Sequence, residues 1–412
     1  GVRGTLETSY RKLLDDEQYH LVIHNAPFDL AVMVVEQPDL LPKVFAALDA
    51  GRIHCTRIRD MMLHNATTGL TDDNGPKVGF HLSDVIKRRF DIDISETKSG
   101  PDVWRLRYSE LDGVPLNEWP DEAKTYARDD AVWHLRVFLH QEEERAEAVN
   151  MIDYAAGKSM IIDPLEDEPG QMRAAFALHL MAIYGVLTDE EAVQTLEADL
   201  TAVVAAANEK LKASGILKGT SKKNKETGLV EVKWSKDTKF IKGLVEASFA
   251  AQGLACPKTD PSDADTVTGA PGRFPDGQTQ TDEETLRATN HPDLLVLAEV
   301  GTDTTMLGKW VPALKGLTKN AKTKAFEQRG LRLPRGWHIS PGWNVLVSTG
   351  RTSCWGPALQ QMPRPKKEKP VLAKLRPCVI PRPGHYFLSV DYSFIELVTW
   401  AQTCIDLLGK SD

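Results

Sequence analysis

The sequence has few cysteines. Its 412 residues include Cys55, Cys256, Cys354, Cys378 and Cys404. These five are odd in number and far apart, and none belongs to a CxxC pair. This pattern argues against a disulfide framework and against a zinc knuckle, so we expect reduced thiols.

Long hydrophobic runs are also missing. No stretch reaches the roughly 18 to 20 uninterrupted apolar residues that a transmembrane helix needs. The N-terminal sequence GVRGTLETSYRKLLDDEQ has no apolar core of the signal-peptide kind. Hydrophobic residues make up 42% of the chain, which over this length is enough for about two or three separate cores. We therefore expect a cytoplasmic, multidomain protein with no membrane partner.

Positive charge is in deficit overall but unevenly distributed. The net charge of −8 alone argues against a polyanionic partner. However, the first basic segment, residues 210–242, has ten lysines and three acidic residues, and the second basic segment, residues 362–376, has six basic residues and one acid. Two such segments fit a surface that binds phosphates along one track. The alternative for each is a solvated lysine-rich loop.

The chain falls into zones of different periodicity. Residues 1–150 mix strand-like runs, such as HLVIH at 20–24, with helices such as 122–144, which predicts an α/β domain. Residues 172–214 have helical spacing, broken at Tyr184 and Gly185 and restarting after Thr188. Thr188 and Glu191 have the spacing of a capping box.

The second half is less regular. Residues 216–280 predict irregular connections around one short helix near 237–250. Helical pattern returns from about 282 to 314, and turns and strands are expected from 336 to 391.

Two segments of the N-terminal zone carry candidate functional residues. In LVIHNAPFDLAVM, residues 21–33, a strand leads into Asn25, and Asp29 lies in the first turn of a helix. A carboxylate there is also simply a good helix start. In TYARDDAVWHLRVFL, residues 125–139, Tyr126 and Asp130 are four apart and share a helix face. The alternative is an ordinary solvated face.

A third segment reads SVDYSFIEL, residues 389–397. The run YFLSV before Asp391 predicts a strand, and IELVTWA after it predicts a helix. Ser393 and Glu396 also fit a capping box at the start of that helix.

The first two segments together resemble the second and third motifs of DEDDy-type 3′–5′ exonucleases. The resemblance implies a ribonuclease H-like α/β domain in which acidic side chains hold two divalent ions. It assigns Asp29 and Asp130 to the metal ions and Tyr126 to the attacking water, and it lets Asn25 contact the DNA strand. The family's first motif, D-x-E, would lie before Gly1.

Residues 348–363, STGRTSCWGPALQQMP, and 390–397, VDYSFIEL, resemble in order and spacing two segments of family A DNA polymerases, the bacterial polymerase I and phage type. The resemblance implies a multidomain enzyme that performs template-directed DNA synthesis with 3′–5′ proofreading, in replication or repair. It divides the chain into an exonuclease domain (1–150), a connection with the start of the α+β palm (151–188), a mostly α-helical thumb (189–335) and a palm segment (336–412).

The resemblance also implies ligands and roles. Mg²⁺, two ions per site with Mn²⁺ as a substitute, would be held in the polymerase site by Asp391 and the carbonyl of Tyr392. Glu396 and Ile395 would shape the nucleotide pocket. The expected partners are primer–template DNA, deoxynucleoside triphosphates and single-stranded 3′ ends; no processivity partner is identified. DNA contacts are assigned to Arg351, Gln360, Lys218, Lys222, Lys223 and Lys225.

The sequence departs from the family at several positions. Phe394 replaces a usual Gln, Val398 a usual Arg, and Ala358 and Gln361 usual asparagines. Nothing after Asp391 supplies a fingers helix or a second catalytic aspartate, so we expect the middle piece of a longer polymerase. The alternative function is a catalytically incomplete module that binds primer–template or single-stranded DNA.

Overall fold

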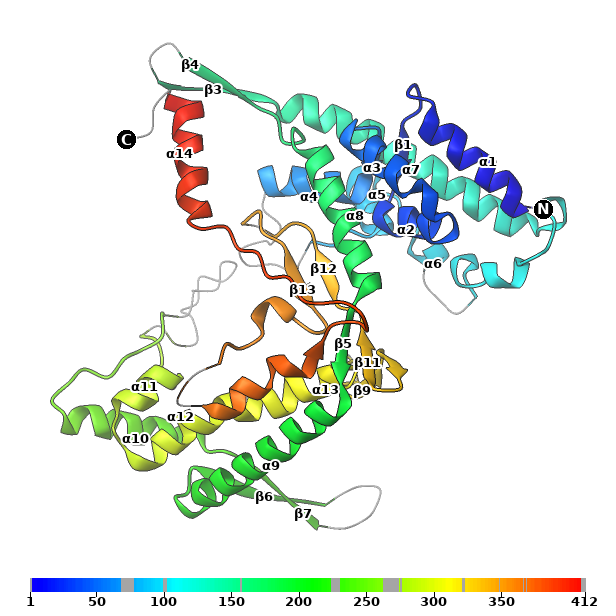
Figure 1. Ribbon diagram of the computed structural model, residues 1–412. Coiled ribbons are helices and arrows are strands. Elements are labelled where there is room, and N and C mark those ends of the chain that lie inside the picture. Colours follow the sequence, from blue (N-terminus) through cyan, green and yellow to red (C-terminus); the bar gives the residue numbers. More distant parts are fainter. Residues whose placement is uncertain are drawn as a thin grey trace. The chain divides into compact units, whose positions relative to one another are not determined.

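The computed structural model describes residues 2–67, 78–98, 102–155, 158–223, 230–261, 274, 276–320, 323–347, 349–365, 367 and 369–408. The chain is mixed α/β and mostly helical (Figure 1). It divides into two compact units. The first unit comprises Gly1–Gly185, Ser340–Gln360 and Phe387–Asp412, and the second comprises Val186–Ile339 and Gln361–Tyr386.

The first unit combines helices with short strands. Its described elements are α1 (Val2–Asp15), β1 (Leu21–Ile23), α2 (Ala26–Glu36), η1 (Pro38–Leu40), α3 (Leu41–Asp49), β2 (Ile53–Cys55), α4 (Thr56–Thr67), α5 (Leu82–Phe90), α6 (Ser95–Lys98), η2 (Trp104–Leu106), η3 (Tyr108–Leu111), η4 (Leu116–Glu118), α7 (Asp121–Ala148), β3 (Asn150–Ala155), β4 (Lys158–Ile162), α8 (Glu168–Tyr184), β12 (Gly342–Asn344), β13 (Ser353–Trp355), η6 (Leu359–Gln361) and α14 (Ile395–Leu408).

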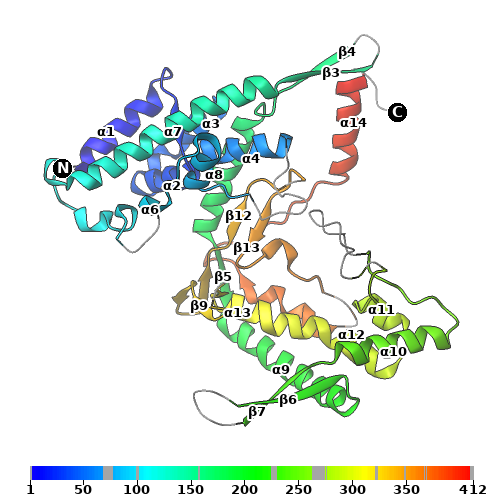
Figure 2. The same cartoon turned by 180° about the vertical axis from the view of Figure 1, so that it is seen from behind.

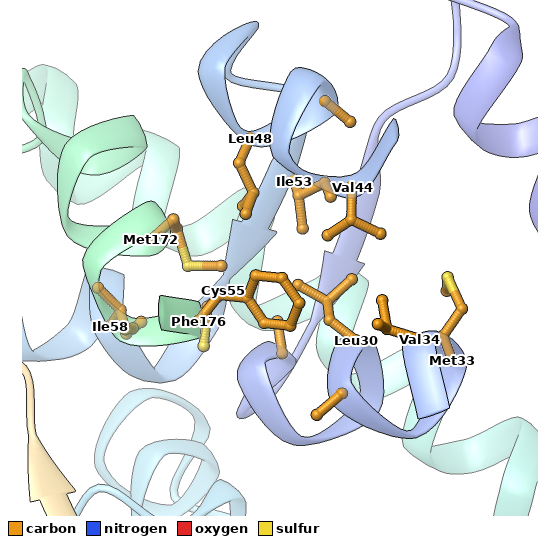
Figure 3. Close-up of a cluster of buried hydrophobic side chains, with 14 of the residues drawn as sticks. Leu30, Met33, Val34, Val44, Leu48, Ile53, Cys55, Ile58, Met172 and Phe176 are labelled. Atoms are coloured by element: carbon orange, nitrogen blue, oxygen red, sulfur yellow. The ribbon is translucent and has the colours of Figure 1, made fainter. Parts of the chain in front are cut away.

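The core of the first unit forms around the parallel strands β1 and β2, in which Leu21 pairs with Ile53. Side chains from α2, α3, α4 and α8 cover this pair, and Figure 3 shows them converging on Phe176 and Cys55. Both of these side chains are fully buried. Burying one such apolar side chain stabilises a fold by about 1.5 to 3 kcal/mol, so this cluster anchors the segments that carry the candidate residues.

Helix α2 follows β1 after a sharp change of direction. Asn25 has a left-handed backbone conformation, φ 64° and ψ 41°, which asparagine adopts more readily than most residues. Pro27 lies in the first turn, where its missing N–H costs no helical hydrogen bond. The helix ends at Glu36, shortly before Pro38 begins the next turn. This geometry fixes Asn25 at the strand end and Asp29 one turn into the helix.

Helix α7 is the long helix seen from behind in Figure 2. It follows Pro120 and has Asp121 and Glu122 in its first turn, where acidic side chains favour the helix dipole. Val137 is buried against α5, and the buried Gln141 donates from Nε2 to the carbonyl of Thr56 at 2.8 Å. These contacts fix the rotation of α7.

A buried polar network joins α7, α4 and α8. Arg59 is 1% exposed and donates to Glu168 at 2.5 Å and also to Glu142. The other Glu168 oxygen lies 2.9 Å from Nδ1 of His54, whose Nε2 lies 3.0 Å from His20. Buried charges are tolerated because they are paired in this way.

The second unit contains helices and an antiparallel sheet. Its described elements are β5 (Val186–Asp189), α9 (Glu190–Ala213), β6 (Leu217–Lys223), β7 (Val230–Lys236), α10 (Thr238–Ala251), α11 (Glu283–Ala288), α12 (Pro292–Thr305), the π-helical η5 (Met306–Trp310), α13 (Val311–Leu314), β8 (Leu317–Lys319), β9 (Phe326–Gln328), β10 (Leu331–Leu333), β11 (Gly336–Ile339), η7 (Pro370–Lys374), η8 (Arg376–Cys378) and β14 (Val379–Ile380).

Two features organise the second unit. The strands form a four-stranded antiparallel sheet in the order β10-β11-β5-β14, with Leu187 opposite His338. Apolar side chains of α9, α10, α11 and α12 form one cluster, which includes Leu211, Val245 and Leu294. Helix α10 lies close to the short helix predicted near 237–250, and α11 to α13 lie within the helical range predicted from about 282 to 314.

The predicted capping box at Thr188 is wrong. Thr188 lies in β5, is 1% exposed, and donates from its hydroxyl to the carbonyl of Leu314 at 2.9 Å. The helix cap is Asp189, whose side chain accepts from the backbone of Ala192. The sheet thus extends one residue further than the spacing of Thr188 and Glu191 indicated.

The prediction of irregular structure from 216 to 236 is also wrong. Strands β6 and β7 pair there as an antiparallel hairpin, with Gly219 opposite Trp234. Val230, Val232 and Trp234 alternate along one face of β7, and all are at least 45% exposed. The lysines around them concealed this alternation.

Within the described residues, no helix is long and apolar enough to cross a bilayer.

Candidate functional site

The first candidate segment lies at the end of β1. Asn25 Oδ1 accepts a hydrogen bond from Arg57 of α4 at 2.8 Å. Asp29 is exposed as a residue, yet partial desolvation of its carboxyl raises its pKa. The pKa of Tyr10 in α1 is raised mainly by burial and additionally by the negative charge of Asp29. Asn25 is therefore held by a guanidinium, whereas the charge of Asp29 acts on Tyr10 of α1.

In the second candidate segment, on α7, the two candidate side chains bind the ammonium group of a lysine. Tyr126 and Asp130 share one helix face, as the sequence predicted, and Lys98 reaches both. The Lys98 ammonium donates to the Tyr126 hydroxyl at 2.9 Å and to Oδ1 of Asp130. It also lies 4.2 Å from the centroid of the Tyr126 ring, a cation–π distance. Its side chain is only 13% exposed.

Two histidines connect the α7 site to the β1 end. The rings of His24 and His134 are stacked with centroids 6.2 Å apart, and His134 lies one turn after Asp130. Burial lowers the pKa of His24 to about 3, with His134 and Arg57 adding to the effect. Burial also lowers the pKa of His134, against the attraction of Asp130. Both imidazoles are therefore neutral at pH 7.

A cavity of about 320 Å³ opens beside Asn25. Arg57, His179, Trp343 and Trp355 are among the residues that line it. Two of these come from the β12–β13 hairpin, in which Gly342 pairs with Trp355. A Cβ at Gly342 would lie 2.3 Å from the Trp355 ring, so only glycine allows this close approach. The walls combine aromatic faces with amide and guanidinium donors.

The residues as arranged do not form a metal site. Among the described residues, no group of three or more His, Cys, Asp or Glu side chains could hold a metal ion. The carboxylate of Asp130 is already neutralised by the ammonium of Lys98. A divalent ion prefers several oxygen ligands, and Asp130 alone does not supply them.

The segment around Asp391 is exposed throughout. All residues from 387 to 400 are exposed, and Val390, Tyr392 and Trp400 are each more than 70% exposed. The strand predicted for YFLSV is absent from described residues 386–390, because β-prone residues need a partner strand. The predicted helix is confirmed as α14.

Helix α14 begins one residue later than the proposed capping box requires. It starts at Ile395, and Phe394, with φ 56°, precedes it and accepts the first helical hydrogen bond from Val398. Ser393 therefore lies outside the cap position. Asp391, Tyr392, Ile395 and Glu396 are all exposed, and their assignment to a polymerase site stays a prediction.

The TGR segment forms a turn next to β13. Gly350 has φ 74°, a conformation that favours glycine, and its N–H bonds to the carbonyl of Val347 at 2.8 Å. Arg351 is exposed beside this turn. Gln360 is also exposed and donates from Nε2 to Thr352 at 3.2 Å. Both side chains are accessible for contacts with a ligand.

The two basic segments differ in what their charges contact. Lys218 is exposed on β6, which also carries Lys222 and Lys223; Lys225 lies outside the described residues. In the second basic segment, Lys369 is 7% exposed and pairs with Glu283, and Lys374 pairs with Asp199. Part of the second segment is therefore used inside the fold.

Sequence inspection missed three residues of the α7 site. Lys98, His24 and His134 come from separate elements, and no spacing rule connects them. His134 had a usable signal, since it lies four residues after Asp130 on a predicted helix. Lys98 had none, because its partner lies 32 residues further along the chain.

Comparisons with known proteins give one kind of match. No family model matches this chain, and no curated protein matches it. A similar solved structure is the POL domain of Pol1 from M. smegmatis in complex with DNA primer-template and dNTP. The two share 14% sequence identity with a TM-score of 0.42. The match covers 79% of this chain and 41% of that chain, so this chain spans less than half of its length.

Proposed function

We propose that this chain acts in template-directed DNA synthesis of the family A type, with 3′–5′ proofreading of the primer end. The observation that carries the proposal is the ordered pair of polymerase-like segments, residues 348–363 and 390–397. In this proposal Asp391 and Tyr392 serve nucleotidyl transfer, and Glu396 and Ile395 shape the sugar pocket. The partners would be primer–template DNA and deoxynucleoside triphosphates.

The proofreading part has its own support. Helix α7 packs against β1, and the face of α7 that carries Tyr126 and Asp130 continues to His134, which stacks on His24 next to Asn25. The cavity beside Asn25 has tryptophan faces on which a base of a single strand could stack. We infer that a single-stranded 3′ end is the ligand of this region.

The residues of the chain would then have distinct tasks. Arg57 orients the Asn25 amide through its hydrogen bond, which leaves the amide N–H₂ to donate to a strand. Arg351 would contact acceptors in the minor groove at the primer terminus, which all base pairs present. The lysines of β6 would contact duplex phosphates. The proposed chemistry requires Mg²⁺, with Mn²⁺ as a substitute. In the structure the ammonium of Lys98 is bonded to the Asp130 carboxylate, which leaves no position for the ion there.

A second candidate function is favoured by that ion pair. A chain in which Lys98 neutralises Asp130 would bind single-stranded or primer–template DNA without cutting it. The two functions share DNA binding and differ in catalysis.

Fluorescence anisotropy of a labelled primer–template tests the shared part. We expect Arg351→Ala to weaken binding, because a groove contact is lost. The control Arg335→Ala removes an arginine that is likewise exposed and lies in the turn between β10 and β11, and it should leave the affinity unchanged. No binding by the unmodified chain at low salt would reject both functions.

A further inference from the structure

The cavity beside Asn25 differs in charge from another cavity of the molecule. Of the described residues that line it, none carries a carboxylate, and Arg57 carries a guanidinium. A cavity of about 260 Å³ in the second unit, called the acidic cavity below, is lined instead by the three acidic residues 189–191 together with Arg335. The chain has a net charge of −8, so its composition does not explain a wall without carboxylates. The cavity beside Asn25 therefore favours an anionic ligand.

The positive charge in this cavity comes from Arg57. The residue is half-buried on α4, and its Nη1 donates to Oδ1 of Asn25 at 2.8 Å. That acceptor is a neutral amide, so the contact orients the guanidinium without cancelling its charge. Burial, His134 and then Arg57 lower the pKa of His24, which shows that the charge acts inside the first unit. His179 also lines the cavity, but burial lowers its pKa and it is neutral at pH 7.

The β12–β13 hairpin adds aromatic surface to the same cavity. Trp343 and Trp355 both line it, and β12 packs against α8 within the first unit. Gly342 pairs with Trp355, and because glycine has no Cβ the indole ring can lie against the strand. Trp355 is 53% exposed, so much of its ring surface is open to a ligand. Aromatic rings of this kind stack on nucleobases.

We propose that the cavity beside Asn25 binds one free nucleoside monophosphate, with its phosphate at Arg57 and its base against Trp355. The volume of about 320 Å³ lies at the lower end of the range for small-molecule sites, about 300 to 1,000 Å³, and so suits a single nucleotide. A phosphate monoester carries about −1.5 to −2 charges at pH 7 and pairs well with a guanidinium. The choice of a nucleotide among anionic aromatic compounds rests on the proposed function, since 3′–5′ proofreading releases nucleoside monophosphates.

Isothermal titration calorimetry on the 412-residue chain, in EDTA and without DNA, tests the phosphate contact. We expect deoxyadenosine monophosphate to bind at least about tenfold more tightly than deoxyadenosine. Arg57→Met should remove this preference by weakening the monophosphate alone, whereas Arg57→Lys should keep part of it. Arg335→Met is the matched control, because it removes an arginine from the acidic cavity and should leave both affinities unchanged.

Trp355→Ala tests the base contact. It should weaken the monophosphate and the nucleoside alike, by about tenfold, because stacking acts on the base that the two ligands share. Trp234→Ala removes a ring of similar exposure, 45%, from β7 of the second unit and should change neither affinity.

Three results would overturn the proposal. They are no binding of deoxyadenosine monophosphate at about 1 mM, equal affinity for the monophosphate and the nucleoside, and a preference that survives in folded Arg57→Met. If circular dichroism shows that Arg57→Met does not fold, Arg57→Gln carries the same prediction. Because the titration contains neither DNA nor metal, its failure is separate from that of the proposed function: a chain that binds primer–template but not the monophosphate would refute this inference alone.

Discussion

The α7 site and the Asp391 segment both carry sequence motifs, yet their side chains are held very differently in the structure. Tyr126 and Asp130 lie on a helix fixed by buried contacts, and both meet Lys98. Asp391 and Glu396 lie in a segment, residues 387–400, that is exposed at every position. The difference teaches that a motif identifies chemistry, whereas packing decides whether its side chains are held in place.

The largest effect should separate the packed core from the exposed segment. Phe176→Ala removes a fully buried ring that contacts Phe45, with centroids 5.3 Å apart. We expect it to lower the free energy of unfolding by about 3 to 5 kcal/mol. Trp400→Ala, at a residue 71% exposed, should change it by less than about 0.5 kcal/mol. Urea unfolding compares the two, and equal losses would show that residues 387–400 are packed in solution.

The basic segments offer a second comparison, in DNA binding. Replacing Lys218, Lys222, Lys223 and Lys225 by alanine should reduce the slope of log affinity against log salt by up to about four. Over a fourfold change in salt, that corresponds to a change in affinity on the order of a hundredfold. Anisotropy titrations between low and physiological salt measure the slope.

Lys369 and Lys374 provide the control for that experiment. Both pair with carboxylates of the second unit, and Lys369 is only 7% exposed, so their replacement by methionine should leave the salt slope unchanged. If the slope falls with these two lysines and not with the β6 group, the DNA track runs along the second basic segment.

The buried histidine His24 predicts a pH dependence of the packed region. The unfolded residue binds a proton near its ordinary pKa of about 6.5, and burial lowers the pKa in the folded protein to about 3. Between these values the unfolded state binds more protons, so stability falls as the pH falls. From pH 7 to pH 5 the loss from His24 should be about 2 kcal/mol.

His24→Gln should remove that part of the pH dependence in urea unfolding. His134, His179 and His64 also have pKa values lowered first by burial, so part of the slope will remain. Above pH 8, where neither state binds the proton, the pH dependence of the variant and the unmodified chain should coincide. An unchanged slope from pH 7 to 5 would mean that His24 is accessible to protons in the folded chain.

The smallest effect compares the two motif aspartates. Asp130→Asn leaves the Lys98 ammonium without its carboxylate and should cost about 1 kcal/mol of stability. Asp391→Asn changes an exposed carboxylate and should be neutral within about 0.5 kcal/mol. Thermal melting of the two variants checks this, and a loss for Asp391→Asn would indicate a contact that holds its segment.

Much of the fold could be predicted where local signals agree with packing. Helices α7, α10 and α14 lie where the sequence placed helices, and the break at Gly185 appears where the sequence placed it. The β6–β7 hairpin was missed because lysines are interspersed with the alternating Val230, Val232 and Trp234 of β7 and concealed their period of two. Thr188 was misassigned because β5 needs its partners β11 and β14, which are distant in sequence.

The candidate site was predictable only in its helical part. Tyr126 and Asp130 share a face because helix geometry alone requires it. Lys98 and His24 reach the site through tertiary packing, which no short spacing encodes. Asp29 lies in the first turn of α2, as its motif predicted, but the group on which its charge acts is Tyr10 of α1. Whether Asp29 acts together with Asp130 stays a prediction.

The most direct test of the account is one primer assay on the longest form of the protein that contains these residues. A labelled primer on its template, with Mg²⁺ and deoxynucleoside triphosphates, reports lengthening and shortening together. We predict that Asp391→Asn loses lengthening by orders of magnitude and keeps shortening, because its charge acts on the transition state, and that Asp130→Asn does the reverse. Lengthening by Asp391→Asn at the rate of the unmodified protein would contradict the account.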